Sequence, residues 1–132
     1  MKWIKSDISM RSNRKVIQTA NELGLTVPQF IGHMHCFWHT VLDQQEDGDL
    51  RLWDHNVIAE AFYWRPTVDE IATGTKVDSV NLLQVLKEQG WIDDMKIHDW
   101  VDYAGVFLIG KYSSWNVKKL QQIWALYGRE YG

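Results

Sequence analysis

A helix followed directly by a β-hairpin is the sequence feature that most restricts the fold of this 132-residue chain. Residues 77–89 predict an amphipathic helix whose inward face carries four apolar side chains: Val80, Leu82, Leu83 and Leu86. Gly90 ends this helix, because glycine readily adopts the left-handed conformation common at helix ends. Residues 91–92 and 96–98 then predict two short strands around an acidic Asp93-Asp94 turn.

Helical spacing and capping residues predict most of the other elements. Thr26 can cap a long helix that has Pro28 in its first turn and ends near residue 45. The remaining expected helices cover residues 13–23, 55–63, 68–72, 102–111 and 117–127. Strands are expected at residues 2–6 and 50–53, where apolar and polar side chains alternate. The chain is therefore predicted to be mainly α-helical, within the α+β class.

Composition places the chain among small globular proteins. Hydrophobic residues make up 45% and eight tryptophans are present, enough for one packed core. The uncharged stretch of residues 27–42 is too short and too rich in histidine to span a bilayer. The N-terminus has no apolar signal core, and the single Cys36 cannot form an internal disulfide. These features predict a cytoplasmic protein with no membrane contact.

Charge is distributed unevenly around a formal net value of -3. Residues 1–42 hold five basic and two acidic residues, and residues 103–132 hold four basic and one acidic residue. The middle segment, residues 43–102, holds five basic against fourteen acidic residues. Surfaces that bind nucleic acid are normally basic, so the two ends of the chain suit that role better than the middle.

Several segments together resemble a known family. The stretch TVDEIATGTKVDSVNLLQVLKEQGWI, from Thr67 to Ile92, resembles a winged helix-turn-helix. With MKWIK, ELGLTVPQFIGHMHCFWHTVLDQQEDGDL and IHDWVDYAG added, roughly residues 1–105 resemble the N-terminal domains of phage replisome-organiser and DnaD-like replication proteins. The resemblance implies a winged helix-turn-helix domain over residues 1–104. A helical extension, residues 105–132, would pack on this domain or mediate association.

The sequence departs from the family pattern in two places. Family members usually carry a further C-terminal domain or a basic tail, whereas this chain ends soon after Tyr127. The connection 65–76 is also longer than usual, which leaves two registers for the first helix of the helix-turn-helix. We favour residues 55–63 as the packed helix and residues 68–72 as an inserted turn.

The helix at residues 77–89 is the candidate reader of duplex DNA. Asn and Gln can pair with adenine in the major groove, and Lys can neutralise phosphates. The candidate DNA-binding residues are Lys76, Ser79, Asn81, Gln84, Lys87 and, in the wing, Lys96. Asp78, Glu88 and the Asp93-Asp94 tip would repel phosphate. The competing interpretation is an ordinary solvated face on a structural helix.

Two further surfaces are candidates. A secondary basic patch would consist of Lys2, Lys5, Arg11, Arg14 and Lys15, joined by Lys118 and Lys119 if the two ends converge. The alternative for these residues is solubilising charge. Trp115, Trp124 and Tyr127 could form a homodimer seam or a partner patch. Alternatively, the last helix folds back and completes the core.

Neither catalysis nor metal binding is expected. His35, His39 and Asp43 share one helical stripe, but a zinc site needs further ligands, so we expect a His39–Asp43 ion pair and a buried or half-buried Cys36. No nucleophile–base arrangement or phosphate loop is apparent. We therefore expect no enzymatic activity, no metal and no cofactor.

Three functions from different classes follow. The first is a phage-type DNA-binding, replication-initiation module that contacts double-stranded DNA and recruits other replication proteins. The second is a protein–protein interaction module whose acidic segment recruits or inhibits a phage or host protein. The third is a homodimerising structural domain that associates through its last helix.

Overall fold

The computed structural model describes residues 12–132, so the expected strand at residues 2–6 lies outside the described residues. The elements in this part of the chain are α1 (Arg14–Glu22), α2 (Val27–Gln44), α3 (His55–Ala61), α4 (Val68–Ala72), α5 (Ser79–Glu88), β1 (Ile92–Asp93), β2 (Lys96–Ile97), α6 (Trp100–Tyr112) and α7 (Val117–Leu126). The prediction of a mainly helical chain with one small hairpin is confirmed.

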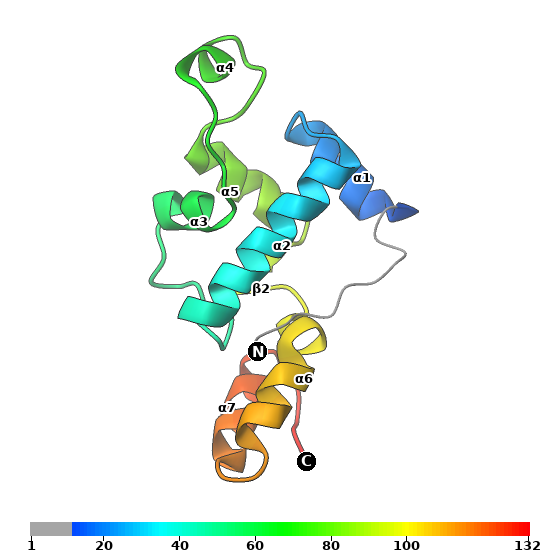
Figure 1. Cartoon of the computed structure of the whole chain (residues 1–132), viewed down its shortest axis with the longest axis vertical. Coiled ribbons are helices and arrows are strands. Elements are labelled where there is room, and N and C mark those ends of the chain that lie inside the picture. The colour runs from blue at the N-terminus through cyan, green and yellow to red at the C-terminus, as the bar shows by residue number, and fades with distance from the viewer. Residues whose placement is uncertain (1–11) are drawn as a thin grey trace.

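The long helix α2 runs through the middle of the molecule and is contacted by α1 and α3 (Figure 1). Its start is fixed by a capping box, in which the Thr26 side chain accepts from the backbone of Gln29 and the Gln29 side chain accepts from the backbone of Thr26. Six of its side chains are buried: Phe30, Met34, Phe37, Trp38, Val41 and Leu42. These apolar side chains form the centre of the core.

The helix α4 does not take part in the packed core. It projects away from the other helices at one end of the molecule and has no buried residue (Figure 1). The helices α3 and α5 pack directly against each other instead. Of the two registers left open by the sequence, α3 is therefore the helix paired with α5. The segment of residues 65–76 that carries α4 is an insertion between them, which we call the α4 excursion.

The hairpin is short and antiparallel, with Ile92 opposite Ile97 and Asp93 opposite Lys96. Asp49 adds one isolated bridge to Lys96, but the strand expected at residues 50–53 does not form. That prediction was wrong because the Asp49 carboxylate accepts a hydrogen bond from the backbone N–H of Arg51, which turns the chain after one bridge.

The last two helices pack on each other and on the turn at residues 46–49. The Trp100 indole N–H donates to the Glu46 carbonyl at 2.8 Å, and the Tyr127 hydroxyl donates to the Asp47 carbonyl at 2.6 Å. Trp100 is fully buried. The helix α6 runs without a break across the predicted boundary between residues 104 and 105, and both of these residues are buried. Within residues 12–132, no helix has the length and hydropathy needed to cross a membrane.

Candidate nucleic-acid interface

The helix α5 is held firmly against α3. Leu82 and Leu86 are fully buried, and the Asp78 carboxylate caps the helix by accepting from the Asn81 N–H at 2.9 Å. The Ser79 hydroxyl lies 2.8 Å from His55 Nδ1 and donates to Asn56 Oδ1 at 3.2 Å. Ser79 was expected to contact DNA, but its hydroxyl joins the first turns of α3 and α5.

Asn81, Gln84 and Glu88 are exposed on the outer face of α5, as the sequence predicts, and Lys87 is exposed near its edge. Val80 also lies on the surface, with 55% of its area exposed, so its expected inward position was wrong. The reason is geometric: Val80 is two residues from Leu82, about 200° around the helix axis from the buried side. The outer face of α5 is therefore mixed, with two amides, one ammonium group, the Glu88 carboxylate and one aliphatic side chain.

Two acidic groups weaken the attraction of this face for DNA phosphates. The Gln84 side-chain amide donates to Glu88 Oε1 at 2.8 Å, so one candidate reader is engaged within the helix. The Asp78 carboxylate lies at the start of the same helix. A phosphate backbone approaching α5 would meet both carboxylates, and each would weaken the attraction to Lys87.

The other two candidate lysines are paired with carboxylates. Lys76 Nζ lies 3.2 Å from Glu70 in the α4 excursion, and Lys96 Nζ lies 3.2 Å from Asp94 at the hairpin tip. Both side chains are largely shielded from solvent. Of the six residues that the sequence proposes for DNA, the structure therefore brings only Asn81, Gln84 and Lys87 together on one open face.

Lys15 does not contribute to a basic patch. Its ammonium group donates to the Gly90 carbonyl at 2.8 Å and lies 4.2 Å from the centre of the Trp91 ring. Burial lowers the pKa of Lys15, against the attraction of Asp93 and Asp99. Lys15 thus links α1 to the end of α5, whereas Arg14 is exposed. Lys2, Lys5 and Arg11 lie outside the described residues.

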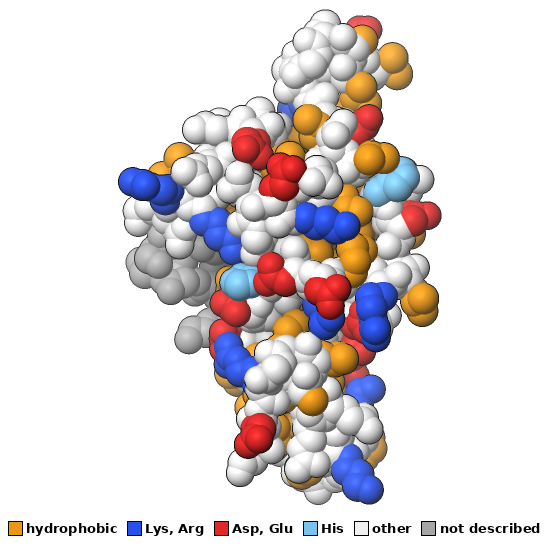
Figure 2. All heavy atoms as spheres, turned by 180° about the vertical axis from the view of Figure 1, so that it is seen from behind, with side chains coloured by type: hydrophobic (Ala, Val, Ile, Leu, Met, Phe, Trp, Pro, Cys, Tyr) orange, Lys and Arg blue, Asp and Glu red, His pale blue; other side chains and the backbone are white. Residues whose placement is uncertain are grey.

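Positive charge is mostly neutralised on the described surface. Six of the eleven Lys and Arg side chains in residues 12–132 form ion pairs with carboxylates. Figure 2 shows blue and red side chains interspersed across the rear face, with no continuous blue area. Pairs of this kind on a surface contribute little stability, but they reduce the net positive field that would attract a polyanion.

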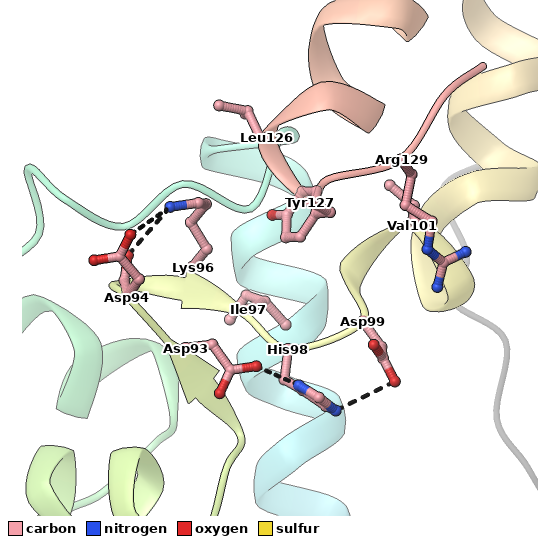
Figure 3. Close-up of a pocket in the computed structure, with 10 residues that line it drawn as sticks. All are labelled: Asp93, Asp94, Lys96, Ile97, His98, Asp99, Val101, Leu126, Tyr127 and Arg129. Carbon is pink, nitrogen blue, oxygen red and sulfur yellow. Dashed lines mark hydrogen bonds and ion pairs between the residues drawn. The ribbon is translucent and has the colours of Figure 1, made fainter.

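A pocket of about 360 Å³ lies between the hairpin and the C-terminal segment (Figure 3). His98 lies between two carboxylates, with Nδ1 bonded to Asp93 and Nε2 3.2 Å from Asp99. Arg129 reaches the rim and pairs with Asp102 at 2.7 Å. Sequence reasoning missed this pocket, because residues 126–129 are far along the chain from the hairpin. Its acidic rim does not extend a phosphate-binding surface.

The proposed interface residues have different environments. Trp124 is only 9% exposed and packs on Gly105 of α6, and Tyr127 is held by its hydrogen bond to Asp47. The positions of Trp124 and Tyr127 therefore agree with the alternative interpretation, in which the last helix folds back and completes the core. Trp115 is 68% exposed and remains open to a partner.

Cys36 is exposed, so the expectation that it is buried or half-buried was wrong. Helical geometry explains its position, since Cys36 lies about 100° from the buried Phe37 on α2. Within the part of the chain that the structure describes, no group of three His, Cys, Asp or Glu side chains is placed to hold a metal ion.

No protein-family model matches the chain, and no curated protein or solved structure matches it. Inference about its function therefore rests on the residues themselves.

Proposed function

We propose that the protein is a non-enzymatic DNA-binding module of the replication-initiation type, in which α5 is presented to duplex DNA. The observation that supports it best is the open face of Asn81, Gln84 and Lys87 on a helix that packs on α3 and runs directly into a hairpin. The same order of elements carries the resemblance to phage replisome-organiser and DnaD-like domains.

The chemistry of this face suits weak groove contact. The Asn81 amide can donate and accept at an adenine edge, and Lys87 can neutralise one phosphate. Gln84 can contribute only after it leaves Glu88. Because one ammonium group faces two carboxylates, we expect weak binding that disappears as salt rises.

Duplex binding across a salt series tests this proposal. The variant Asn81→Ala/Gln84→Ala/Lys87→Ala should lose most of the affinity. A matched control, Gln18→Ala/Asn21→Ala/Arg65→Ala, removes two exposed amides and one positive charge from other elements and should bind as the parent protein does. Equal loss in both variants, or no binding by the parent at low salt, would refute the role of α5.

A charge substitution on the same face gives an independent test. Glu88→Gln removes a carboxylate beside Lys87 and weakens the hold on the Gln84 amide. We expect duplex affinity to rise severalfold at low salt, because the phosphates no longer face this charge. An unchanged or reduced affinity would place the DNA contact elsewhere.

A specific observation favours a second candidate, a protein-binding module. The helices α3, α4 and α5 each expose aliphatic side chains, namely Val57 on α3, Val68 and Ile71 on α4, and Val80 on α5. Acidic residues are frequent in the same segment, with Asp54, Asp69 and Asp78 all exposed. A partner for this surface would combine aliphatic and basic side chains. Val68→Ser/Ile71→Ser would disrupt that complex and leave duplex binding unchanged.

A further inference from the structure

The turn between α6 and α7 carries an exposed tryptophan, Trp115, and the first turn of α7 follows with Lys118 and Lys119, at a site separate from α5. We call residues 113–119 the aromatic tip. We propose that the aromatic tip binds single-stranded nucleic acid, with Trp115 stacking on a base and Lys118 and Lys119 contacting phosphates. This contact uses different residues from the proposed duplex contact. Each of the two proposals can therefore be refuted without affecting the other.

Trp115 is unusually open for a tryptophan in this chain. It is 68% exposed, whereas Trp38, Trp64, Trp91, Trp100 and Trp124 are all buried. Exposing so large an apolar surface costs free energy unless a partner covers it. Val117, 41% exposed, adds an aliphatic surface two residues away.

The Trp115 ring is nevertheless held in place. Its indole N–H donates to the Lys111 carbonyl at 2.7 Å, and its ring centre lies 5.6 Å from that of Tyr112. Tyr112 is buried and its hydroxyl is bonded to the Glu46 carboxylate. A ring held this way loses little side-chain freedom when a base stacks on it, which favours binding.

The charge around the aromatic tip is positive, in contrast to that around the hairpin. Within residues 12–132, Lys118 and Lys119 form no ion pair, and residues 103–132 contain one acidic residue, Glu130. The Glu46 carboxylate, which lies within electrostatic reach of Lys119, is hydrogen-bonded to Lys111 and Tyr112. Helix α6, 13 residues and therefore about 20 Å long, separates this region from Asp99 near the hairpin. That distance exceeds the Debye length of about 8 Å in physiological salt, so the acidic hairpin repels little here.

An unpaired strand fits these groups better than a duplex does. In a duplex the flat faces of the bases are covered by their neighbours, whereas single strands offer them to aromatic side chains. Stacking on an exposed ring is tolerant of base identity, and lysines track the backbone through charge alone. The expected ligand is therefore a short unstructured oligonucleotide of any sequence.

Binding of a labelled oligothymidylate, followed by anisotropy across a salt series, tests the proposal. Trp115→Leu keeps an apolar side chain but removes the ring, and should weaken binding by at least about 5-fold, the lower range for one stacked base. Trp115→Phe keeps a ring and should bind within about 3-fold of the parent, since stacking persists. Lys118→Ala/Lys119→Ala should reduce the slope of log affinity against log salt by about 1.4, as for two phosphates on a single strand.

Arg51→Ala/Arg65→Ala is the charge-matched control, because it also removes two positive charges but from connections outside the aromatic tip. Its salt slope should equal that of the parent. Equal slopes for both double variants, or equal affinity of Trp115→Leu and Trp115→Phe, would overturn the proposal. Binding of the parent to anionic phospholipid vesicles without binding to the oligonucleotide would also overturn it and assign the aromatic tip to a membrane surface. Unchanged circular dichroism of each variant verifies that its fold is intact.

Discussion

The turn at residues 46–49 and the α4 excursion are both polar, glycine-containing connections, yet only the turn is enclosed by the rest of the chain. The turn accepts hydrogen bonds from Trp100, Tyr112 and Tyr127, which lie more than 50 residues away. The excursion is held mainly from within, by the capping box of Thr67 and Glu70 and by the Lys76–Glu70 ion pair. Polar composition alone therefore does not decide whether a connection is enclosed; here the difference lies in hydrogen bonds from distant aromatic side chains.

Alanine at the two glycines should give the largest difference between these connections. Gly48 has φ +73°, and a Cβ there would lie 2.2 Å from the Tyr127 hydroxyl and 2.7 Å from the Trp100 ring. Gly48→Ala should lower the free energy of unfolding by about 3 kcal/mol, from left-handed strain plus overpacking. Gly74→Ala has similar φ but open space around it, so about 1 kcal/mol is expected. Urea denaturation of both variants measures this, and equal losses would show that the turn is not tightly enclosed.

The hydrogen bond from Tyr127 to Asp47 should have the next largest effect. Tyr127→Phe leaves the Asp47 carbonyl without its donor in a partly buried site, which should cost about 1–2 kcal/mol. Tyr63→Phe is the matched control, because Tyr63 is 54% exposed and should change stability by less than about 0.5 kcal/mol. Thermal denaturation would contradict the expectation if the two variants melted together.

Glu46 should make the enclosed turn sensitive to acid. Burial alone raises the pKa of Glu46, but hydrogen bonds from Lys111 and Tyr112 outweigh it and hold the pKa below its ordinary 4.5. A carboxylate with a lowered folded-state pKa stabilises the protein above pH 4.5, and this contribution is lost as pH falls through the lower value. Glu46→Gln should therefore lose stability at neutral pH and show a flatter decline below pH 4.5. A parallel decline in both proteins would contradict this role.

The smallest effect is expected in the excursion itself. Thr67→Ala removes half of the capping box, so amide protons of α4 should exchange with solvent faster. Global stability should stay within about 0.5 kcal/mol of the parent, because no α4 side chain is buried. Thr26→Ala in the capping box of α2 is the control: its helix contributes to the core, and about 1 kcal/mol should be lost. Equal global losses would mean that the excursion is coupled to the core.

Local signals in the sequence predicted the helices well. Thr26 caps its helix where expected, and Asp54, Thr67 and Asn116 cap theirs in the same way, because a cap is an interaction within three residues. The choice of residues 55–63 over residues 68–72 as the packed helix agrees with the structure, because α3 has three buried residues and α4 has none. The expected strand at residues 50–53 failed because a side-chain turn competes with strand pairing.

The candidate site was predicted less well, since its chemistry depends on long-range pairing. Lys15 reaches Gly90 across 75 positions of sequence, and Trp91 donates to the Thr19 hydroxyl across 72. No local pattern marks either contact. The sequence does not show that Lys76 and Lys96 are neutralised, but in the structure each forms an ion pair with a carboxylate. A tryptophan three residues before a pair of lysines was visible in the sequence, whereas the exposure of Trp115 and the burial of Trp124 were not.

The open surroundings of Gly74 also have a practical consequence. No atom lies within 4 Å of a Cβ built at this position, and the neighbouring Thr73 and Thr75 are exposed. A peptide tag inserted between Gly74 and Thr75 would leave the core contacts of α3 and α5 intact. The excursion is thus a natural attachment point for immobilising the protein, with α5 and the aromatic tip both left accessible to soluble ligands.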